Sequence, residues 1–155
     1  MAADIKKVNI YSDGACLINP GPGGYCAILT YKGAEKIVSG GAPDTTNNRM
    51  ELLAAISGLE AVKDGADFEV DLYTDSKYVA DGITKGWAVG WRRRNWTKSN
   101  KEPALNPELW ERLLCEIARL GSVNFIWIKG HNGHAYNERC DKIASKIAAD
   151  YKNDL

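Results

Sequence analysis

Two strand-like segments of the sequence end in an aspartate that follows a similar run of residues. The segments Ile10-Tyr-Ser-Asp13-Gly and Leu72-Tyr-Thr-Asp75-Ser each place the acid where an apolar run stops. If the two strands are parallel neighbours, their carboxyl ends meet at the edge where open α/β sheets bind ligands. One aspartate at a strand end is more often a turn former or a helix cap, so it is the pair that favours a shared site.

Two acids in helical segments extend this set. Glu51 shares one helical side with Ala55, Gly58 and Val62, and these small residues let that side approach a sheet closely. A carboxylate on such a face must be paired or bind a cation, because unpaired burial costs on the order of several kcal/mol. Asp141 has a similar setting in the last helical segment. For both acids, an ordinary surface charge is the alternative interpretation.

Four converging acids would require divalent cations. Two carboxylates about 4 Å apart repel by roughly 4 kcal/mol at an effective dielectric of about 20. Oxygen ligands favour Mg²⁺ or Mn²⁺ over Zn²⁺, and two such ions stabilise the attacking and leaving oxygens of a phosphoryl displacement. The pattern therefore predicts phosphate chemistry. His131 could accept or relay a proton beside the ions, although a lone loop histidine is usually only solvated.

Charge is distributed unevenly along the chain. The 155 residues contain 20 Lys plus Arg and 20 Asp plus Glu, so the formal net charge is zero. Segment 85–101 nevertheless contains six basic residues and no acid, and its tryptophans Trp87, Trp91 and Trp96 alternate with the arginines. Two interpretations are open: a helix whose tryptophans enter the core, or a basic aromatic surface that binds nucleic acid.

Composition excludes several classes of protein. With 45% hydrophobic and 26% charged residues, the chain is typical of soluble globular proteins, and we expect one domain over residues 1–155. No apolar run approaches the roughly 20 residues of a membrane span, and the N-terminus lacks the pattern of a secretory signal. We therefore expect a cytoplasmic protein without membrane contact. The four dispersed cysteines are expected to be reduced thiols.

The elements that must position the acids follow from hydrophobic periodicity and turn residues. Strands are predicted over 8–13, 25–31, 36–40, 68–75 and 123–128. Helices are predicted over 46–62, 76–83, 107–120 and 137–151. The first three strands should form an antiparallel meander, with the glycines of 19–24 serving turns. A right-handed crossover through the helix at 46–62 should then make the fourth strand parallel to the first.

Five blocks of the sequence resemble bacterial-type ribonuclease HI in order and approximate spacing. They are Ile10-Tyr-Ser-Asp-Gly-Ala-Cys16, Asn19-Pro-Gly-Pro-Gly-Gly-Tyr25, Thr45-Thr-Asn-Asn-Arg-Met-Glu-Leu52, Tyr73-Thr-Asp-Ser76, and Lys129-Gly-His131 through Asn137-Glu-Arg-Cys-Asp141. The resemblance covers nearly the whole chain and implies the α/β ribonuclease H-like fold. That fold has a mixed five-stranded sheet, three antiparallel strands and then parallel ones, flanked by helices.

The resemblance also implies an activity and a role for each matching residue. It implies an endoribonuclease that hydrolyses the RNA strand of RNA/DNA hybrids to 5′-phosphate and 3′-hydroxyl ends, with two Mg²⁺ ions or Mn²⁺ as a substitute. The implied metal-binding and catalytic acids are Asp13, Glu51, Asp75 and Asp141, with His131 assisting proton transfer or product departure.

Residues outside the acid set match the positions at which the family contacts its substrate. The hybrid and its 2′-hydroxyls would be contacted by Cys16, Asn19, Asn47, Asn48 and Lys77, the last in place of a common glutamine. A phosphate of the DNA strand would be held by Thr46 and Asn106. Segment 85–101 resembles the family's basic protrusion and contributes Trp87, Trp91, Arg92, Arg93 and Arg94.

Two other classes of function remain open. Integrase, transposase and resolvase relatives have a similar fold but cut DNA, and a binding module would hold hybrids without cutting them. A binding module should have lost some of the acids, and all four are present. A hybrid-cutting nuclease is therefore the leading hypothesis, and we expect it to be a monomer.

Overall fold

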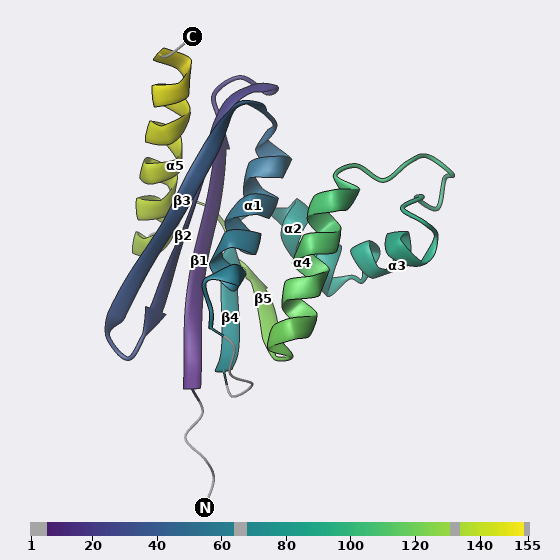
Figure 1. The fold of residues 1–155 in the computed structure, drawn as a ribbon, viewed down its shortest axis with the longest axis horizontal. Helices are drawn as coiled ribbons and strands as arrows, with labels where there is room; N and C mark the ends of the chain where they lie inside the picture. Colours follow the sequence, from purple (N-terminus) through teal and green to yellow (C-terminus); the bar gives the residue numbers. More distant parts are fainter. Residues whose placement is uncertain (1–5, 64–67, 131–133, 154–155) are drawn as a thin grey trace, which may run out of the picture.

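The computed structural model describes residues 6–63, 68–130 and 134–153 (Figure 1). Five strands form one sheet in the order β3-β2-β1-β4-β5. They are β1 (Lys6–Cys16), β2 (Gly21–Tyr31), β3 (Ala34–Thr45), β4 (Phe68–Thr74) and β5 (Val123–Trp127). The first three strands are antiparallel, whereas β4 is parallel to β1 and β5 is parallel to β4. The predicted mixed sheet is confirmed.

Four helices of the described residues match the predicted ranges to within two residues at each end, and a further one lies in segment 85–101, where a helix was one of two interpretations. They are α1 (Asn47–Glu60), α2 (Lys77–Thr84), α3 (Trp87–Arg93), α4 (Pro107–Leu120) and α5 (Ala135–Asn153). Thr46 caps α1, because its Oγ1 accepts a hydrogen bond from the Arg49 N–H at 3.2 Å. Pro107 occupies the first turn of α4, and Gly121, with a φ of +81°, follows its last residue.

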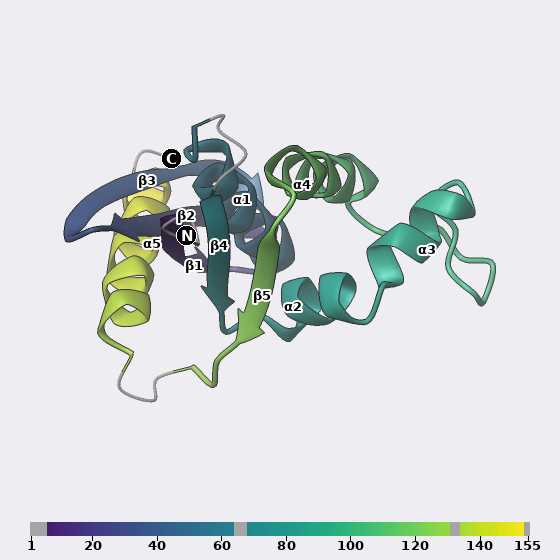
Figure 2. The ribbon, with the colours of Figure 1, turned by 90° about the horizontal axis from the view of Figure 1, so that it is seen from below.

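Helices cover both faces of the sheet (Figure 2). The larger core lies between the sheet and helices α1 and α4, where Ile10, Leu52 and Trp110 are fully buried. A smaller cluster under α5 contains Cys26, Ile28, Cys140 and Ala144. All four cysteines are free thiols, as predicted. Within the described residues, no helix is both long and apolar enough to cross a membrane.

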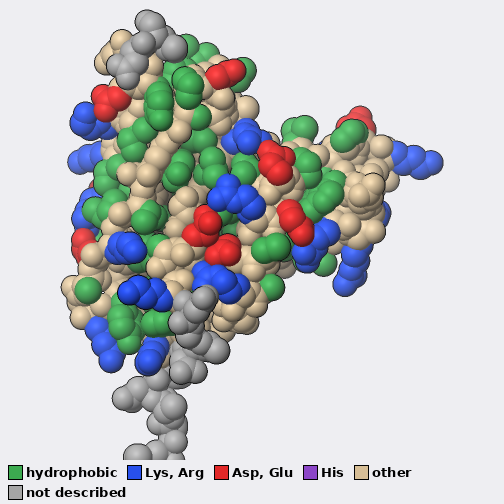
Figure 3. Space-filling view, viewed as in Figure 1, with side chains coloured by type: hydrophobic (Ala, Val, Ile, Leu, Met, Phe, Trp, Pro, Cys, Tyr) green, Lys and Arg blue, Asp and Glu red, His purple; other side chains and the backbone are tan. Residues whose placement is uncertain are grey.

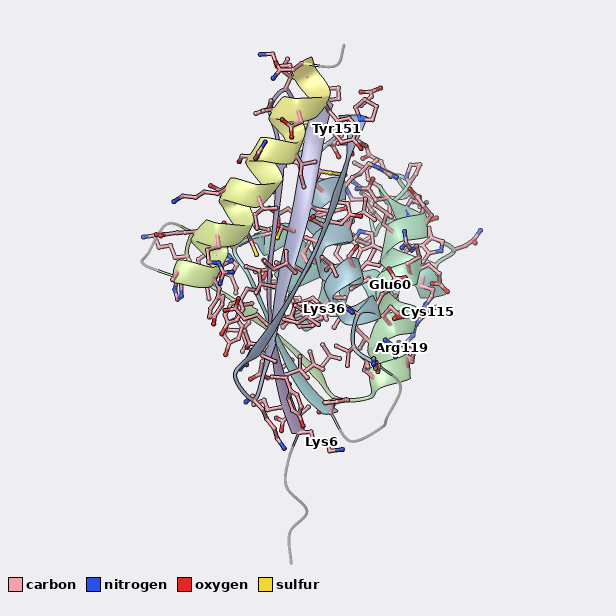
Figure 4. The ribbon with its side chains drawn as sticks, turned by 60° about the vertical axis from the view of Figure 1, so that its left-hand side comes forward. Lys6, Lys36, Glu60, Cys115, Arg119 and Tyr151 are labelled. Carbon is pink, nitrogen blue, oxygen red and sulfur yellow. The ribbon has the colours of Figure 1, made fainter. Side chains whose placement is uncertain are left out.

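Hydrogen bonds from Arg119 and Tyr151, both labelled in Figure 4, connect helices α4 and α5 to neighbouring elements. Arg119 of α4 donates to the backbone oxygens of Leu59 and Val62 at 2.9 and 3.1 Å, at the end of α1. The hydroxyl of Tyr151, near the end of α5, donates to the Gly41 oxygen on β3 at 3.3 Å. These contacts hold α4 against α1 on one face of the sheet and α5 against β3 on the other.

Three expectations about the strands are wrong. The third strand, predicted over 36–40, spans Ala34–Thr45, because it pairs along nearly the whole length of β2. The first strand does not stop at Asp13 but continues to Cys16, because beyond Ser12 it still pairs with β2 after its pairing with β4 has ended. The glycines at 21–24 do not form a turn but belong to β2. A Cβ atom at Gly24 would collide with the backbone oxygen of Ala144, so this glycine serves the close approach of α5.

Candidate active site

Three carboxylates meet at the edge of the sheet where parallel pairing ends. One oxygen each from Asp13, Glu51 and Asp75 lie within 4.8 Å of one another. Asp13 is 5% exposed and Glu51 is 4% exposed, so two of the three acids are buried. Asp141 of α5 lines the same hollow but lies outside this group of three. The structure thus brings together the acids that the sequence places on four different elements.

Close backbone packing puts Glu51 beside Asp13. A Cβ atom at Gly14 would lie 2.5 Å from the backbone nitrogen of Glu51, so only glycine lets β1 pass α1 at this distance. Farther along α1, a Cβ at Gly58 would lie 2.7 Å from Ile10 Cγ2. The small side of α1 therefore faces the sheet, as its sequence pattern predicts.

Asp75 is fixed by the turn between β4 and α2. Thr74 Oγ1 accepts from the Ser76 N–H at 3.1 Å, and Ser76 Oγ caps α2 by accepting from the Val79 N–H at 3.2 Å. The indole nitrogen of Trp127 donates to the Asp75 backbone oxygen at 3.0 Å. Lys77 Nζ lies 5.0 Å from the centre of the Trp127 ring, at the rim of the hollow.

The electrostatics of the hollow oppose three simultaneous negative charges. Burial, followed by repulsion from Asp75, raises the pKa of Asp13 to about 8. Burial, with repulsion from Asp13 and Asp75, also raises the pKa of Glu51 well above its usual range. The Gly14 N–H donates to Asp13 Oδ1 at 3.0 Å, which lowers the pKa of Asp13 and so partly offsets the effect of burial. Without a cation, the protein therefore holds at least one of these acids protonated near neutral pH.

The hollow between these acids has a volume of about 430 Å³. Asn47 and Asn48 of the first turn of α1 form part of its wall. The predicted contact residues Cys16 and Asn19 lie beside this turn, because Asn19 Oδ1 accepts from the Asn47 N–H at 3.2 Å and the Cys16 thiol is 3.6 Å from the Thr45 oxygen. Four of the predicted substrate contacts are thus neighbours around one helix start.

A second polar cluster joins α1 to the start of α4. The guanidinium of Arg49 donates to Asn106 Oδ1 at 3.1 Å and to Glu108 Oε1 at 2.6 Å. The amide of Asn106 donates to the Tyr78 hydroxyl at 3.2 Å. The sequence predicts Thr46 and Asn106 as phosphate-binding residues, whereas Arg49 and Tyr78 were not predicted to take part. The position of Arg49, one turn after Thr46 on the same helix, is the signal that could have identified it.

The basic protrusion, residues 85–101, projects from the body at α3 (Figures 1 and 2). Trp91 packs edge-on against Trp110 at 5.8 Å, whereas Trp87 is 43% exposed beside Lys85. Trp91 and Trp96 thus join the core, as the first interpretation predicts, and Trp87 remains at the surface. Figure 3 shows Lys and Arg side chains around this projecting lobe.

The protrusion also contains a groove of about 560 Å³. Trp87, Trp91 and Arg94 line it, together with Lys98. Arg93 is exposed, and Arg92 makes an exposed ion pair with Glu111 at 3.5 Å. Arginine and aromatic surfaces therefore share one concave face.

The mixed sheet and its buried acids define a ribonuclease H-like α/β domain. The chain belongs to the RNase H family, whose family model matches residues 5–149. It is 55% identical to the ribonuclease H of Desulforamulus reducens, covering 94% of this chain and 89% of that one. It is 54% identical to the ribonuclease H of Erythrobacter litoralis, covering 93% and 97%.

Solved structures agree with this assignment. LC9-RNase H1, a type 1 RNase H with the type 2 active-site motif, superposes with a TM-score of 0.82 at 31% identity, covering 97% of this chain and 76% of that chain. LC11-RNase H1, solved in complex with an RNA/DNA hybrid, gives a TM-score of 0.72 at 25% identity, covering 92% and 97%. The predicted family and fold are confirmed. His131 lies outside the described residues.

Proposed function

We propose that the protein is an endoribonuclease that cuts the RNA strand of RNA/DNA hybrids with two divalent cations, leaving 5′-phosphate and 3′-hydroxyl ends. The observation that carries the proposal is the convergence of Asp13, Glu51 and Asp75 within 4.8 Å. The similar proteins named ribonuclease H, and the relative solved with a hybrid, support the choice of substrate.

The donor set fits a hard divalent cation. The converging ligands are all carboxylate oxygens, the type that Mg²⁺ and Mn²⁺ prefer. Glu51 Oε2 is buried without a hydrogen-bond partner among the described residues, as expected of an atom that binds a cation. Asp13, Glu51, Asp75 and Asp141 would hold the ions. When bound, the cations activate a water and stabilise the leaving oxygen of the phosphodiester.

The remaining residues bind the hybrid and move protons. Asn47 and Asn48, in the wall of the hollow, offer amides that can both donate to and accept from a ribose 2′-hydroxyl. Cys16 and Asn19 support them from the adjoining turn. We assign His131 a proton-transfer role at the leaving oxygen because of its place in the sequence between β5 and α5.

Phosphate contacts would flank the hollow on the side of α4 and α3. Arg49 and Asn106 are hydrogen-bonded to each other, and a phosphate of the DNA strand would replace Glu108 as the anionic partner of the Arg49 guanidinium. The protrusion adds Arg92, Arg93 and Arg94, whose attraction for the backbone is independent of sequence and falls with salt. Lys77 extends this positive rim beside Asp75.

Cleavage of matched substrates tests the proposal. A labelled RNA/DNA hybrid, the same sequence as duplex DNA and as duplex RNA would each be incubated with Mg²⁺ and then with chelator. We expect the hybrid alone to be cut, only in its RNA strand and only with the metal. Cutting of duplex DNA would favour the integrase-type alternative, and hybrid binding without cutting would favour the binding module.

The organisation of the protein is part of the proposal. We propose that residues 1–155 act as one catalytic domain, as a monomer and in the cytoplasm. Light scattering on the purified protein at several concentrations should give one mass close to 17.0 kDa. A mass that doubles with concentration would contradict the monomer.

A further inference from the structure

Asn137 is a buried polar residue whose amide has no hydrogen-bond partner among the described residues. It lies in the first turns of α5 and is 7% exposed. Neither its Nδ2 nor its Oδ1 has a hydrogen-bond partner among the described residues. An amide buried in this way destabilises a fold, so its presence needs an explanation beyond packing.

The surroundings of Asn137 restrict what its amide can bind. Asn137 lines a void of about 10 Å³ together with Asp13, Asp75, Glu138 and Asp141. Such a void has room for about one water molecule. Ionised carboxylates accept hydrogen bonds but donate none, so they can satisfy Nδ2 but not Oδ1. Among the described residues, the donor to Oδ1 is therefore either a protonated acid or a molecule from outside the protein, and once a cation has ionised the acids only the outside molecule remains.

We infer that Asn137 is a positioning residue that binds the hydration shell of the cation held by Asp13 and Asp75. This inference rests on the cation site of the proposed function. Mg²⁺ keeps several of its waters when bound to protein carboxylates, and those waters present hydrogens outward. The amide oxygen of Asn137 would accept from such a water, and Nδ2 would then donate to one of the carboxylates that line the same void.

The placement of α5 supports this role. Asn137 and Asp141 are four residues apart, so they lie on the same side of the helix and both face the void. Between them, the Cys140 thiol donates to the Tyr11 oxygen at 3.2 Å, on the strand that carries Asp13. This hydrogen bond ties the first turns of α5, which carry Asn137, to the strand that carries Asp13. Groups that orient a metal's outer ligands typically change its affinity by about 10- to 100-fold.

Thermal melting of the free protein in chelator and in rising Mg²⁺ tests the inference without any hybrid. For Asn137→Ala we expect the Mg²⁺ concentration at half of the melting-temperature rise to increase by about tenfold. In chelator its melting temperature should equal or exceed that of the wild type, because an unpaired buried amide has been removed. Asn137→Asp should melt lower in chelator and gain more from Mg²⁺, because it adds a carboxylate to the void.

Asn124→Ala is the matched control. Asn124 is also an amide in contact with an aspartate, since its Nδ2 donates to Asp71 at 3.2 Å, but it lies outside the hollow. Its loss should leave the Mg²⁺ dependence unchanged. In the cleavage assay, high Mg²⁺ should restore kcat of Asn137→Ala toward the wild-type value.

Three outcomes would overturn the inference. They are an unchanged Mg²⁺ midpoint in Asn137→Ala, an equal loss of melting temperature at every Mg²⁺ concentration, and a wild-type protein whose melting ignores Mg²⁺. Failure of the proposed substrate is a separate result. A wild-type protein that responds to Mg²⁺ but leaves hybrids intact would refute hybrid cleavage while the Asn137 comparison still stands.

Discussion

The acidic hollow and the basic protrusion differ in where their charges lie. The hollow buries its charges: Asp13 and Glu51 are 5% and 4% exposed and come from β1 and α1, which form the core. The protrusion keeps its charges in water on the seven-residue helix α3, where the cations of Arg92 and Arg93 are exposed. Buried like charges destabilise a fold, whereas exposed cations have little effect on stability.

This difference assigns the chemical step to the hollow and the electrostatic attraction of the substrate to the protrusion. In the hollow, function depends on the position of each oxygen, and the fold tolerates the site only with protons or cations present. In the protrusion, function depends on the number of charges facing the phosphate backbone. Changes in the hollow should therefore alter kcat and stability together, while changes in the protrusion should alter KM and its salt dependence alone.

Asp13→Asn should have the largest effect. The substitution keeps the size of the side chain but removes the negative charge of one of the three converging acids, which would bind the cations. We therefore expect kcat for hybrid cleavage to fall by at least about 10³-fold, as when a central electrostatic group is lost. The metal-free variant should melt higher than wild type, because repulsion with Glu51 and Asp75 is relieved. Initial rates and circular dichroism melting measure both effects.

The control for this change is Asp150→Asn. Asp150 is an exposed acid on α5 that pairs only weakly with Lys146, at 3.4 Å. It should cleave and melt like the wild type. If Asp13→Asn retained normal kcat, the assigned role of Asp13 would be wrong.

The pH dependence of stability should show the buried charge directly. The pKa of Asp13 is raised from 3.8 to about 8, so the folded state binds more protons than the unfolded state between these values. Below about pH 4 the protonated Asp13 therefore does not reduce the free energy of unfolding of the metal-free protein. As the pH rises from about 4 toward 8, that free energy of unfolding declines. A pKa difference of one corresponds to about 1.4 kcal/mol, so we expect a decline of several kcal/mol.

Urea unfolding in chelator at a series of pH values measures this decline. Saturating Mg²⁺ should flatten the curve, because a cation replaces the protons, and Asp13→Asn should flatten it without metal. A metal-free wild type whose stability stays level from pH 5 to 8 would contradict a charged hollow that depends on protons.

Gly14→Ala should destabilise the protein by about 3 kcal/mol, since overpacking against backbone forces the chain apart. Its Cβ would lie 2.5 Å from the backbone of Met50 and Glu51, so β1 and α1 must separate. Gly33→Ala is the control: Gly33 has a φ of +82° and open space around its Cβ, so only backbone strain of about 1 kcal/mol is expected. Equal losses in the two variants would show that the contact with α1 is not the constraint.

Much of this molecule was predictable because local rules agree with the fold. Thr46, Pro107 and Gly121 mark helix ends by backbone chemistry that needs no tertiary contact. Strand ends were less predictable: β1 continues past Asp13 because a neighbouring strand remains available for pairing. No periodic pattern contains that information.

The parts of the site that were missed depend on three-dimensional neighbours. Asn137 belongs to a sequence block that resembles the family, but nothing in that block marks its amide as buried; the structure shows it beside the carboxylates of Asp13 and Asp75 from two other parts of the fold. Arg49 likewise becomes a candidate phosphate-binding residue only through its hydrogen bond to Asn106, 57 residues away in the sequence. The tryptophans of the protrusion divide between core and surface, which spacing alone could not resolve, because the surface of α4 decides which of them is covered.

Replacing Arg92, Arg93 and Arg94 together by Gln should have the smallest effect and complete the comparison. Each lost phosphate contact should lower the slope of log affinity against log salt by about 0.7 to 0.9. We therefore expect KM for the hybrid to rise about tenfold at low salt, with kcat and melting temperature nearly unchanged because these cations make only exposed contacts.

The matched control replaces Lys36, Lys146 and Lys152 by Gln, which removes the same charge from β3 and α5. If net charge alone attracts the hybrid, both triple variants will lose affinity equally. If the protrusion is the binding surface, the arginine variant alone will lose affinity and salt dependence. Since 85–101 is free of acids while the chain as a whole is neutral, the local field rather than the total charge should determine the outcome.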